Sequence, residues 1–150
     1  MKSLKQERNN CWGLLLCLLL FSSGLAAQTG IRIEINRLRN NNGHVLVSLF
    51  REGVGFPDKP ENAIRKAKLS VSNKQAWVLF TDLPAGNYAV AILHDENDDQ
   101  KMNKTMLGLP AEGYGFSNNV MGAFGPPSWS RARFRYAGNT ITIQSIRTRY

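Results

Sequence analysis

The sequence predicts an all-β sandwich, and three observations support this prediction. Apolar and polar residues alternate with a period of two over several stretches, which is the pattern of a strand with one buried face. Asn, Gly and Pro, the common turn residues, separate these stretches. One stretch, residues 58–68, is compatible with a short helix. Short strands separated by turns are typical of two packed sheets.

The first 27 residues have the pattern of a secretory signal peptide. Lys2, Lys5 and Arg8 give a positive start, and an apolar run then ends in small residues at Ala27. The run is about 15 residues long, shorter than the roughly 20 that cross a bilayer. We therefore expect cleavage after Ala27, an exported protein in the periplasm or outside the cell, and one domain over 28–150 without a transmembrane span. An uncleaved N-terminal anchor is the alternative.

The expected mature chain has no cysteine and a basic balance of charge. Cys11 and Cys17 both lie in the first 27 residues, so stability must come from burial rather than from a disulfide. Residues 28–150 contain 16 basic and 10 acidic residues, a net charge of +6. Such a protein can meet anionic envelope polymers, acidic glycans or lipid headgroups. We expect no nucleic-acid partner, because an exported protein seldom meets one.

Two strands are predicted at the start of the domain. Apolar residues stand at alternate positions in 31–38 and again in 43–50. The run Asn-Asn-Asn-Gly at 40–43 lies between them, and these residues tolerate the backbone of a tight turn. The two strands are therefore expected to form a hairpin.

Residues 51–68 break the alternation. Asp58, Pro60 and Glu61 have the order of a helix start, and the residues that follow are compatible with a helix. We expect one or two helical turns that cover an end of the sheet.

A tight corner is predicted at 84–87, between strands at 75–83 and 86–94. Tyr88, Val90 and Ile92 share one face of the second strand. A Leu-Pro-x-Gly-x-Tyr corner recurs in Greek-key sandwiches, where the tyrosine hydroxyl bonds back to the corner's backbone. An ordinary hairpin is the alternative. The corner favours an immunoglobulin/transthyretin-like Greek-key β-sandwich with one long ordered loop and at most one short helix.

The segment from His94 to about Ser130 is irregular. Its apolar and aromatic side chains distinguish it from a disordered segment and predict that it packs on the sandwich; they are Leu107, Leu109, Tyr114, Phe116, Phe124 and Trp129. Two aromatics set between glycines at 113–116 are expected to plug an end of the sandwich, and stacking on a partner is the alternative. A terminal hairpin is expected to turn at 138–139.

The stretch HDENDDQKMN, residues 94–103, holds four of the chain's 11 acidic residues. Carboxylate and amide side chains at every second position are the spacing of a calcium loop, because alternate side chains of a curling backbone converge on one point. The predicted metal ligands, with Ca²⁺ as the candidate cofactor, are Asp95, Asn97, Asp99, the Lys101 carbonyl, Asn103 and Glu112. Gln100 and Met106 stand where an EF-hand has Gly and Glu, so the loop is not an EF-hand. As the alternative, Asp95 and Asn97 cap a turn and the other acids are solvated.

Three runs resemble one family of exported bacterial proteins. They are His94-Asp95-Glu96-Asn97, Leu107-Gly108-Leu109-Pro110 and Glu112-Gly113-Tyr114-Gly115-Phe116-Ser117-Asn118-Asn119. The chain is identified as a member of the family called domain of unknown function 2141 over about residues 30–148. The resemblance implies an exported β-sandwich and no established activity. Where the family usually has Asn-Gly, this chain has Asp99-Gln100, which makes a tight metal-binding turn harder to form.

Three functions remain open. The first is an exported binding or accessory protein, stabilised by calcium through residues 94–103. The second is an envelope-associated structural protein that binds anionic polymers through Arg131, Arg133 and Arg135, which would share one face of a strand. The third is a small hydrolase that uses His94. An enzyme is the least favoured reading, because no nucleophile and base pair is readable and Ser117 is not in a G-x-S-x-G elbow.

Overall fold

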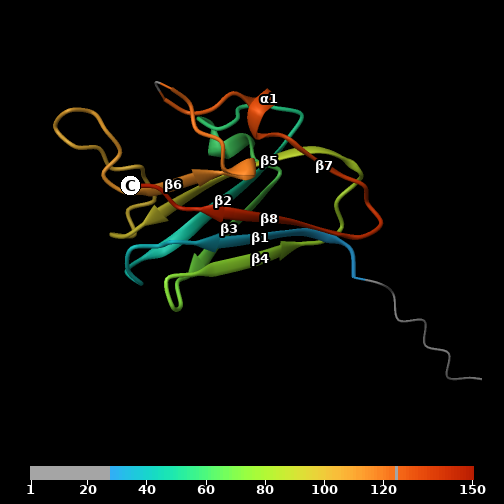
Figure 1. Ribbon diagram of the computed structural model, residues 1–150, viewed down its shortest axis with the longest axis horizontal. Coiled ribbons are helices and arrows are strands. Elements are labelled where there is room, and N and C mark those ends of the chain that lie inside the picture. Colours follow the sequence, from blue (N-terminus) through green and yellow to red (C-terminus); the bar gives the residue numbers. More distant parts are fainter. Residues whose placement is uncertain (1–27, 124) are drawn as a thin grey trace, which may run out of the picture.

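The computed structural model describes residues 28–123 and 125–150, and these form two packed sheets (Figure 1). The expected signal segment, residues 1–27, lies outside them, as does Phe124. The smaller sheet has the order β4-β1-β8, from Ala76–Phe80, Gly30–Asn36 and Ile141–Arg147. The larger has the order β3-β2-β5-β6, from Arg65–Ser70, His44–Arg51, Gly86–Asp95 and Gly113–Phe116, and β7 (Phe134–Tyr136) also pairs with β5.

The helical elements of the described residues are short: η1 (Pro60–Asn62), η2 (Ser117–Asn119) and α1 (Trp129–Ala132). The all-β, sandwich-like fold with at most one short α-helix is thus confirmed. The narrower immunoglobulin/transthyretin-like Greek-key topology stays a prediction.

The core between the sheets contains the apolar faces that the alternation predicts. Three rows of side chains are almost completely buried there: Ile31, Ile33 and Ile35 of β1, Val45, Val47 and Leu49 of β2, and Tyr88, Val90 and Ile92 of β5. Removing this apolar area from water is the main favourable contribution to folding. Strand period alone therefore identifies which face of each strand points inward.

A second, aromatic layer covers the outer face of the larger sheet. The Phe56 ring meets Phe50, Phe116 and Trp129 edge to face, at centroid distances of 5.4, 6.0 and 6.0 Å. Gly53, at φ +79°, lies so close that a Cβ there would be 2.9 Å from the Trp129 ring. This layer buries Phe50, whose side chain lies on the face of β2 opposite the core.

The corner before β5 has the predicted tyrosine contact. The Tyr88 hydroxyl donates a hydrogen bond to the Pro84 carbonyl at 2.5 Å. Burial raises the pKa of Tyr88, so the hydroxyl stays protonated and keeps its donor. β4 and β5 belong to different sheets, and the hairpin alternative is therefore wrong.

Both predicted hairpins are wrong, although their strands exist. β1 pairs with β4 and, in parallel, with β8, whereas β2 pairs with β3 and β5. The connection between β1 and β2 crosses from one sheet to the other, with Leu38 buried in the core. β7 and β8 likewise lie in different sheets. Turn residues permit a reversal but do not determine whether the strands on either side pair.

The prediction of a helix within residues 58–68 is also wrong for most of that stretch. One 3₁₀ turn forms at Pro60–Asn62, and β3 begins at Arg65. Ala67 and Leu69 pack against the core while lysines point outward between them, which is strand period. β3 is the edge of its sheet, where charged side chains discourage pairing with another chain.

We expect Tyr88→Phe to lower the free energy of unfolding by about 1–2 kcal/mol, because the hydrogen bond from the buried Tyr88 side chain to the part-buried Pro84 carbonyl is lost. Urea denaturation measures this. Tyr114→Phe is the control, since the structure gives no hydrogen bond to the Tyr114 hydroxyl within the described residues, and its change should stay within about 0.5 kcal/mol. Equal effects of the two variants would contradict the corner's role.

Candidate functional site

The pairing of β5 with β6 brings together acids that are distant in the sequence. The register places His94 opposite Gly113. The next position in each direction is Asp95, the last residue of β5, and Glu112, just before β6. Opposed residues of an antiparallel pair point to the same face. The two carboxylates are therefore side by side at the end of the sheet.

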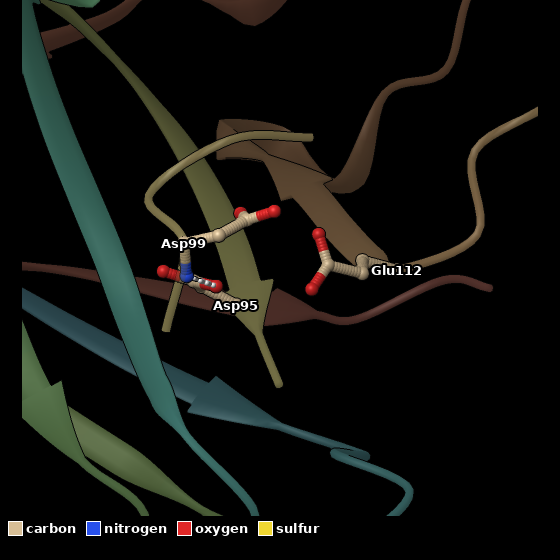
Figure 2. A group of neighbouring side chains, drawn as sticks. All are labelled: Asp95, Asp99 and Glu112. Carbon is tan, nitrogen blue, oxygen red and sulfur yellow. Dashed lines mark hydrogen bonds between the residues drawn. The ribbon is translucent and has the colours of Figure 1, made fainter. Parts of the chain in front are cut away.

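Asp99 completes a group of three carboxylates (Figure 2). One ligand oxygen from each of Asp95, Asp99 and Glu112 lies within 4.8 Å of the others. Asp95 is fully buried and Glu112 is 4 % exposed, whereas Asp99 lies at the surface. The group is referred to below as the carboxylate triad, and it could hold a metal ion.

Backbone N–H groups hold both buried carboxylates in place. Each oxygen of Asp95 and of Glu112 accepts one such hydrogen bond, at 2.9–3.1 Å. The donors are Asp99 and Gln100 to Asp95, and Glu96 and Asn103 to Glu112. These bonds fix the orientation of both carboxylates and curl the loop around them.

The other predicted ligands lie around Asp99. Asn97 accepts from the Asp99 backbone N–H and donates from Nδ2 to its carboxylate. The Lys101 backbone N–H donates to Asp99 Oδ1 at 2.9 Å, and this bond holds the pKa of Asp99 below its ordinary value. The Asn103 carbonyl accepts from Ala111. The turn-capping contacts of the alternative interpretation are thus present alongside the triad.

The remaining acids of residues 94–103 have basic partners. Glu96 forms a two-point ion pair with Arg39, at 2.7 and 2.6 Å, which lowers the pKa of Glu96. Asp98 contacts His44 at 2.6 Å and Lys68 at 3.1 Å, and its pKa is lowered as well. The loop therefore sorts its acids into two that form ion pairs and two, Asp95 and Asp99, that join Glu112.

Gln100 and Asp98 have left-handed backbone, at φ +62° and +61°. This conformation is unfavourable for a residue with a Cβ and natural for glycine. The resemblance implies glycine at the position of Gln100, and this chain adopts the left-handed conformation there with a residue that has a Cβ.

His94 is fully buried and both ring nitrogens have partners. Nε2 lies 2.9 Å from the Asn42 carbonyl, which can only accept, so Nε2 carries a proton. Nδ1 lies 2.6 Å from the Tyr150 hydroxyl. Nδ1 also lies 3.5 Å from Glu96 Oε1.

Arg39 and Tyr150 are functional-site neighbours that sequence reasoning missed. The Arg39 guanidinium lies 4.5 Å from the Tyr150 ring centre, and its backbone N–H donates to the Tyr150 hydroxyl at 2.9 Å. Arg39 also donates to the Ala111 carbonyl, beside Glu112. Neither residue stands in a recognisable motif, and no sequence signal could have paired them.

The comparisons with known proteins identify a family. A family model described as an uncharacterized protein conserved in bacteria (DUF2141) matches residues 33–144. The chain belongs to this family. No curated protein and no solved structure shows a significant match to it. The resemblance inferred from the His94–Asn119 runs is thus confirmed.

Two further predictions concern the surface of this DUF2141 chain. The prediction that Arg131, Arg133 and Arg135 share one face of a strand is wrong. Arg131 lies in α1, Arg133 follows α1, and only Arg135 lies in β7. In the described part of the chain, no helix has the length and apolar character that crossing a membrane requires.

The two glycines of β6 allow neighbouring side chains to pack closely against the strand. A Cβ on Gly115 would lie 2.8 Å from Ile146 Cγ2, and one on Gly113 would lie 2.5 Å from the Tyr150 ring. Ser117, directly after β6, is buried and bonds to the Val90 N–H and the Ala132 carbonyl. It therefore links β5 to α1 and makes no contact with His94.

We expect the Arg39–Glu96 pair to make stability depend on pH in the acid range. The folded pKa of Glu96 lies below its ordinary value of 4.5, so its contribution is present above about pH 4.5 and is lost as the pH falls through the folded pKa. Arg39→Gln should remove about 0.5–1 kcal/mol at pH 7. Urea denaturation from pH 7 downward should show a shallower loss in the variant, and parallel curves would contradict the assignment.

We expect Gln100→Gly to raise the free energy of unfolding by about 0.5 kcal/mol. Glycine removes the strain of the left-handed backbone, and this gain exceeds the entropic cost of the more flexible unfolded chain. The Gln100 side chain is exposed. Gln100→Ala keeps the Cβ and should bring no gain. Thermal or urea denaturation compares the two, and a less stable glycine variant would refute the explanation.

Proposed function

We propose that this DUF2141 chain is an exported binding or accessory protein whose 94–112 loop is fastened by Ca²⁺ at the carboxylate triad. The observation that carries the proposal is the convergence of three carboxylates, two of them buried, from both ends of the loop. Within the described residues no Lys or Arg forms an ion pair with Asp95, Asp99 or Glu112.

Electrostatics supports a cation at this place. Like charges held close together in a partly buried site raise each other's free energy, and a nearby positive charge offsets that cost. Glu96 obtains this compensation from Arg39, and Asp98 obtains it from Lys68. The triad has only uncharged donors, which are backbone N–H groups and the Asn97 amide, and these carry partial charge. A divalent ion would supply the missing positive charge.

The geometry and the donor type fit calcium. Calcium takes six to eight oxygen ligands at about 2.3–2.6 Å, so oxygens on opposite sides of the ion lie about 4.6–5.2 Å apart. The triad oxygens lie within 4.8 Å of one another. All three ligands are carboxylates, which suit a hard cation, and His94 is already engaged on both nitrogens. The Asn97 and Asn103 amide oxygens and the Lys101 carbonyl are the proposed remaining ligands.

Binding at the triad would act on the loop as a whole. Asp95 and Glu112 are fixed to paired strands, while Asp99 belongs to the loop alone. An ion shared by the three would tie the first turn of the loop to its return strand. The segment between, residues 100–111, would then be held in one orientation for binding a partner.

The other two functions have less support. A hydrolase at His94 is disfavoured because the ring is fully buried with both nitrogens bonded. Docking on anionic envelope polymers or glycans through the three arginines loses its geometric basis, because they do not share a strand. The net positive charge still suits an anionic partner.

We expect titration calorimetry with Ca²⁺ to give one site with a Kd on the order of 0.1–1 mM, the range of extracellular calcium modules. Saturating Ca²⁺ should raise Tm through linkage between binding and folding. Asp99→Asn should weaken binding at least tenfold and leave the fold intact, because Asp99 is exposed. Glu61→Gln, an exposed acid in η1, is the control. The absence of heat at millimolar Ca²⁺ would remove the proposal.

A further inference from the structure

The outer part of the long loop forms a small hairpin of its own. The Thr105 N–H donates to the Leu109 carbonyl at 2.8 Å, and the Gly108 N–H donates to the Thr105 carbonyl at 2.9 Å. Lys104 and Pro110 form a bridge below this turn. Figure 1 shows the loop projecting away from both sheets at the end of the molecule where the C-terminus lies. We refer to residues 104–110 as the tip.

The tip presents apolar side chains to solvent. Met106 and Leu107, at 105 % and 86 %, are the two most exposed large apolar residues in the described part of the chain, and Leu109 is 61 % exposed. Our expectation that Leu107 and Leu109 pack on the sandwich is therefore wrong. Internal hydrogen bonds hold the tip away from the body, so these side chains remain in water. A cluster of exposed apolar side chains marks an interaction site more often than isolated ones do.

The charge of the outer loop is uniformly positive. Lys101 and Lys104 are both exposed, and no acidic residue occurs between Asp99 and Glu112. The acids of the loop all lie at its base, where Arg39, His44 and Lys68 or the triad contacts engage them. The surface that meets a partner at the tip is thus apolar at its end and basic along its sides.

We propose that the tip inserts into an anionic lipid surface. Met106, Leu107 and Leu109 would enter the boundary between headgroups and acyl chains, while the two lysines pair with lipid phosphates. Membrane binding of this kind grows with buried apolar area and with attraction to anionic lipids. Both requirements are met within one protruding hairpin.

The size of the tip favours lipid over a protein partner. A stable protein interface takes about 800 Å² from each side, spread over roughly 20–30 residues. The tip has seven residues and projects alone. A lipid surface accepts a narrow wedge because it needs no complementary shape.

This inference rests on the proposed function, in which the loop binds a partner, and it identifies that partner as an anionic lipid surface. It does not rest on the metal, because the hydrogen bonds that form the tip join residues 105–109 and, at its base, the Ala111 N–H and the Asn103 carbonyl, and none of them involves a triad carboxylate. Calcium at Asp99 and Glu112 would fix the base of the loop and with it the direction in which the tip points. The two ideas can therefore fail separately.

The test uses residues 28–150, the expected mature chain, whose described residues form the core between the sheets. Co-sedimentation with vesicles of equal parts phosphatidylglycerol and phosphatidylcholine should show binding, and pure phosphatidylcholine should bind much less. Met106→Gln with Leu107→Gln should weaken binding at least about tenfold, and Lys101→Gln with Lys104→Gln about fivefold per lysine. Val54→Gln, another exposed apolar position, is the control and should bind as the parent does.

Insertion itself is read from a Leu107→Trp variant. Its added emission should shift to the blue on anionic vesicles and be quenched by brominated acyl chains. Equal vesicle binding in Ca²⁺ and in EGTA supports membrane insertion by the tip but not a role for the metal. Vesicle binding only in Ca²⁺ supports both membrane insertion and Ca²⁺ binding at the triad. Absence of vesicle binding in both conditions, or binding that the Met106/Leu107 variant retains, would overturn the inference. Tip-dependent capture of a protein without vesicle binding would also overturn it.

Discussion

The antiparallel register between β5 and β6 is the constraint on which the candidate site depends. It sets Asp95 against Glu112 at the end of the sheet, with sixteen residues of loop closed between them. β5 also pairs with β2 and β7, and its side chains from Tyr88 to Asp95 are buried or half-buried, so Asp95 extends from a strand that is held on both edges. A carboxylate on such a strand cannot turn toward bulk water. Its charge must be balanced where it lies.

Two sets of groups compensate the negative charge of the carboxylates at the end of the sheet. Backbone N–H groups donate one hydrogen bond to each oxygen of the inner carboxylates, and side-chain cations from other elements pair with the outer ones. Arg39 links the two sets because it pairs with Glu96, lies on Tyr150 and bonds to the carbonyl before Glu112. Tyr150 in turn bonds to the buried His94. Three distant segments thus fix one another around the base of the loop.

Features of the fold and of the candidate site that depend on residues close together in the sequence could be predicted from it. Alternation identified the buried faces of β1, β2 and β5, and the Leu-Pro-x-Gly-x-Tyr run predicted the Tyr88 contact, because each signal lies within a few residues. The spacing of Asp95 and Asp99, with the return of Glu112, predicted the triad. Strand pairing was not readable, since the Asn-rich segment after β1 suits a hairpin and a crossing between sheets equally well. Asn118, which bonds to three carbonyls from Arg131 to Arg133, gave no signal because it acts between segments.

The parallel pairing of β1 with β8 has a consequence for how the chain reaches its fold. β1 is the middle strand of its sheet, and one of its two neighbours is the last strand of the described chain. A nascent polypeptide lacking that final segment leaves a row of unpaired amides and carbonyls along β1. Contacts between such distant segments form slowly, and a vacant flank of this kind invites mispairing with other molecules. Holding the polypeptide unstructured until synthesis is complete would avoid that hazard.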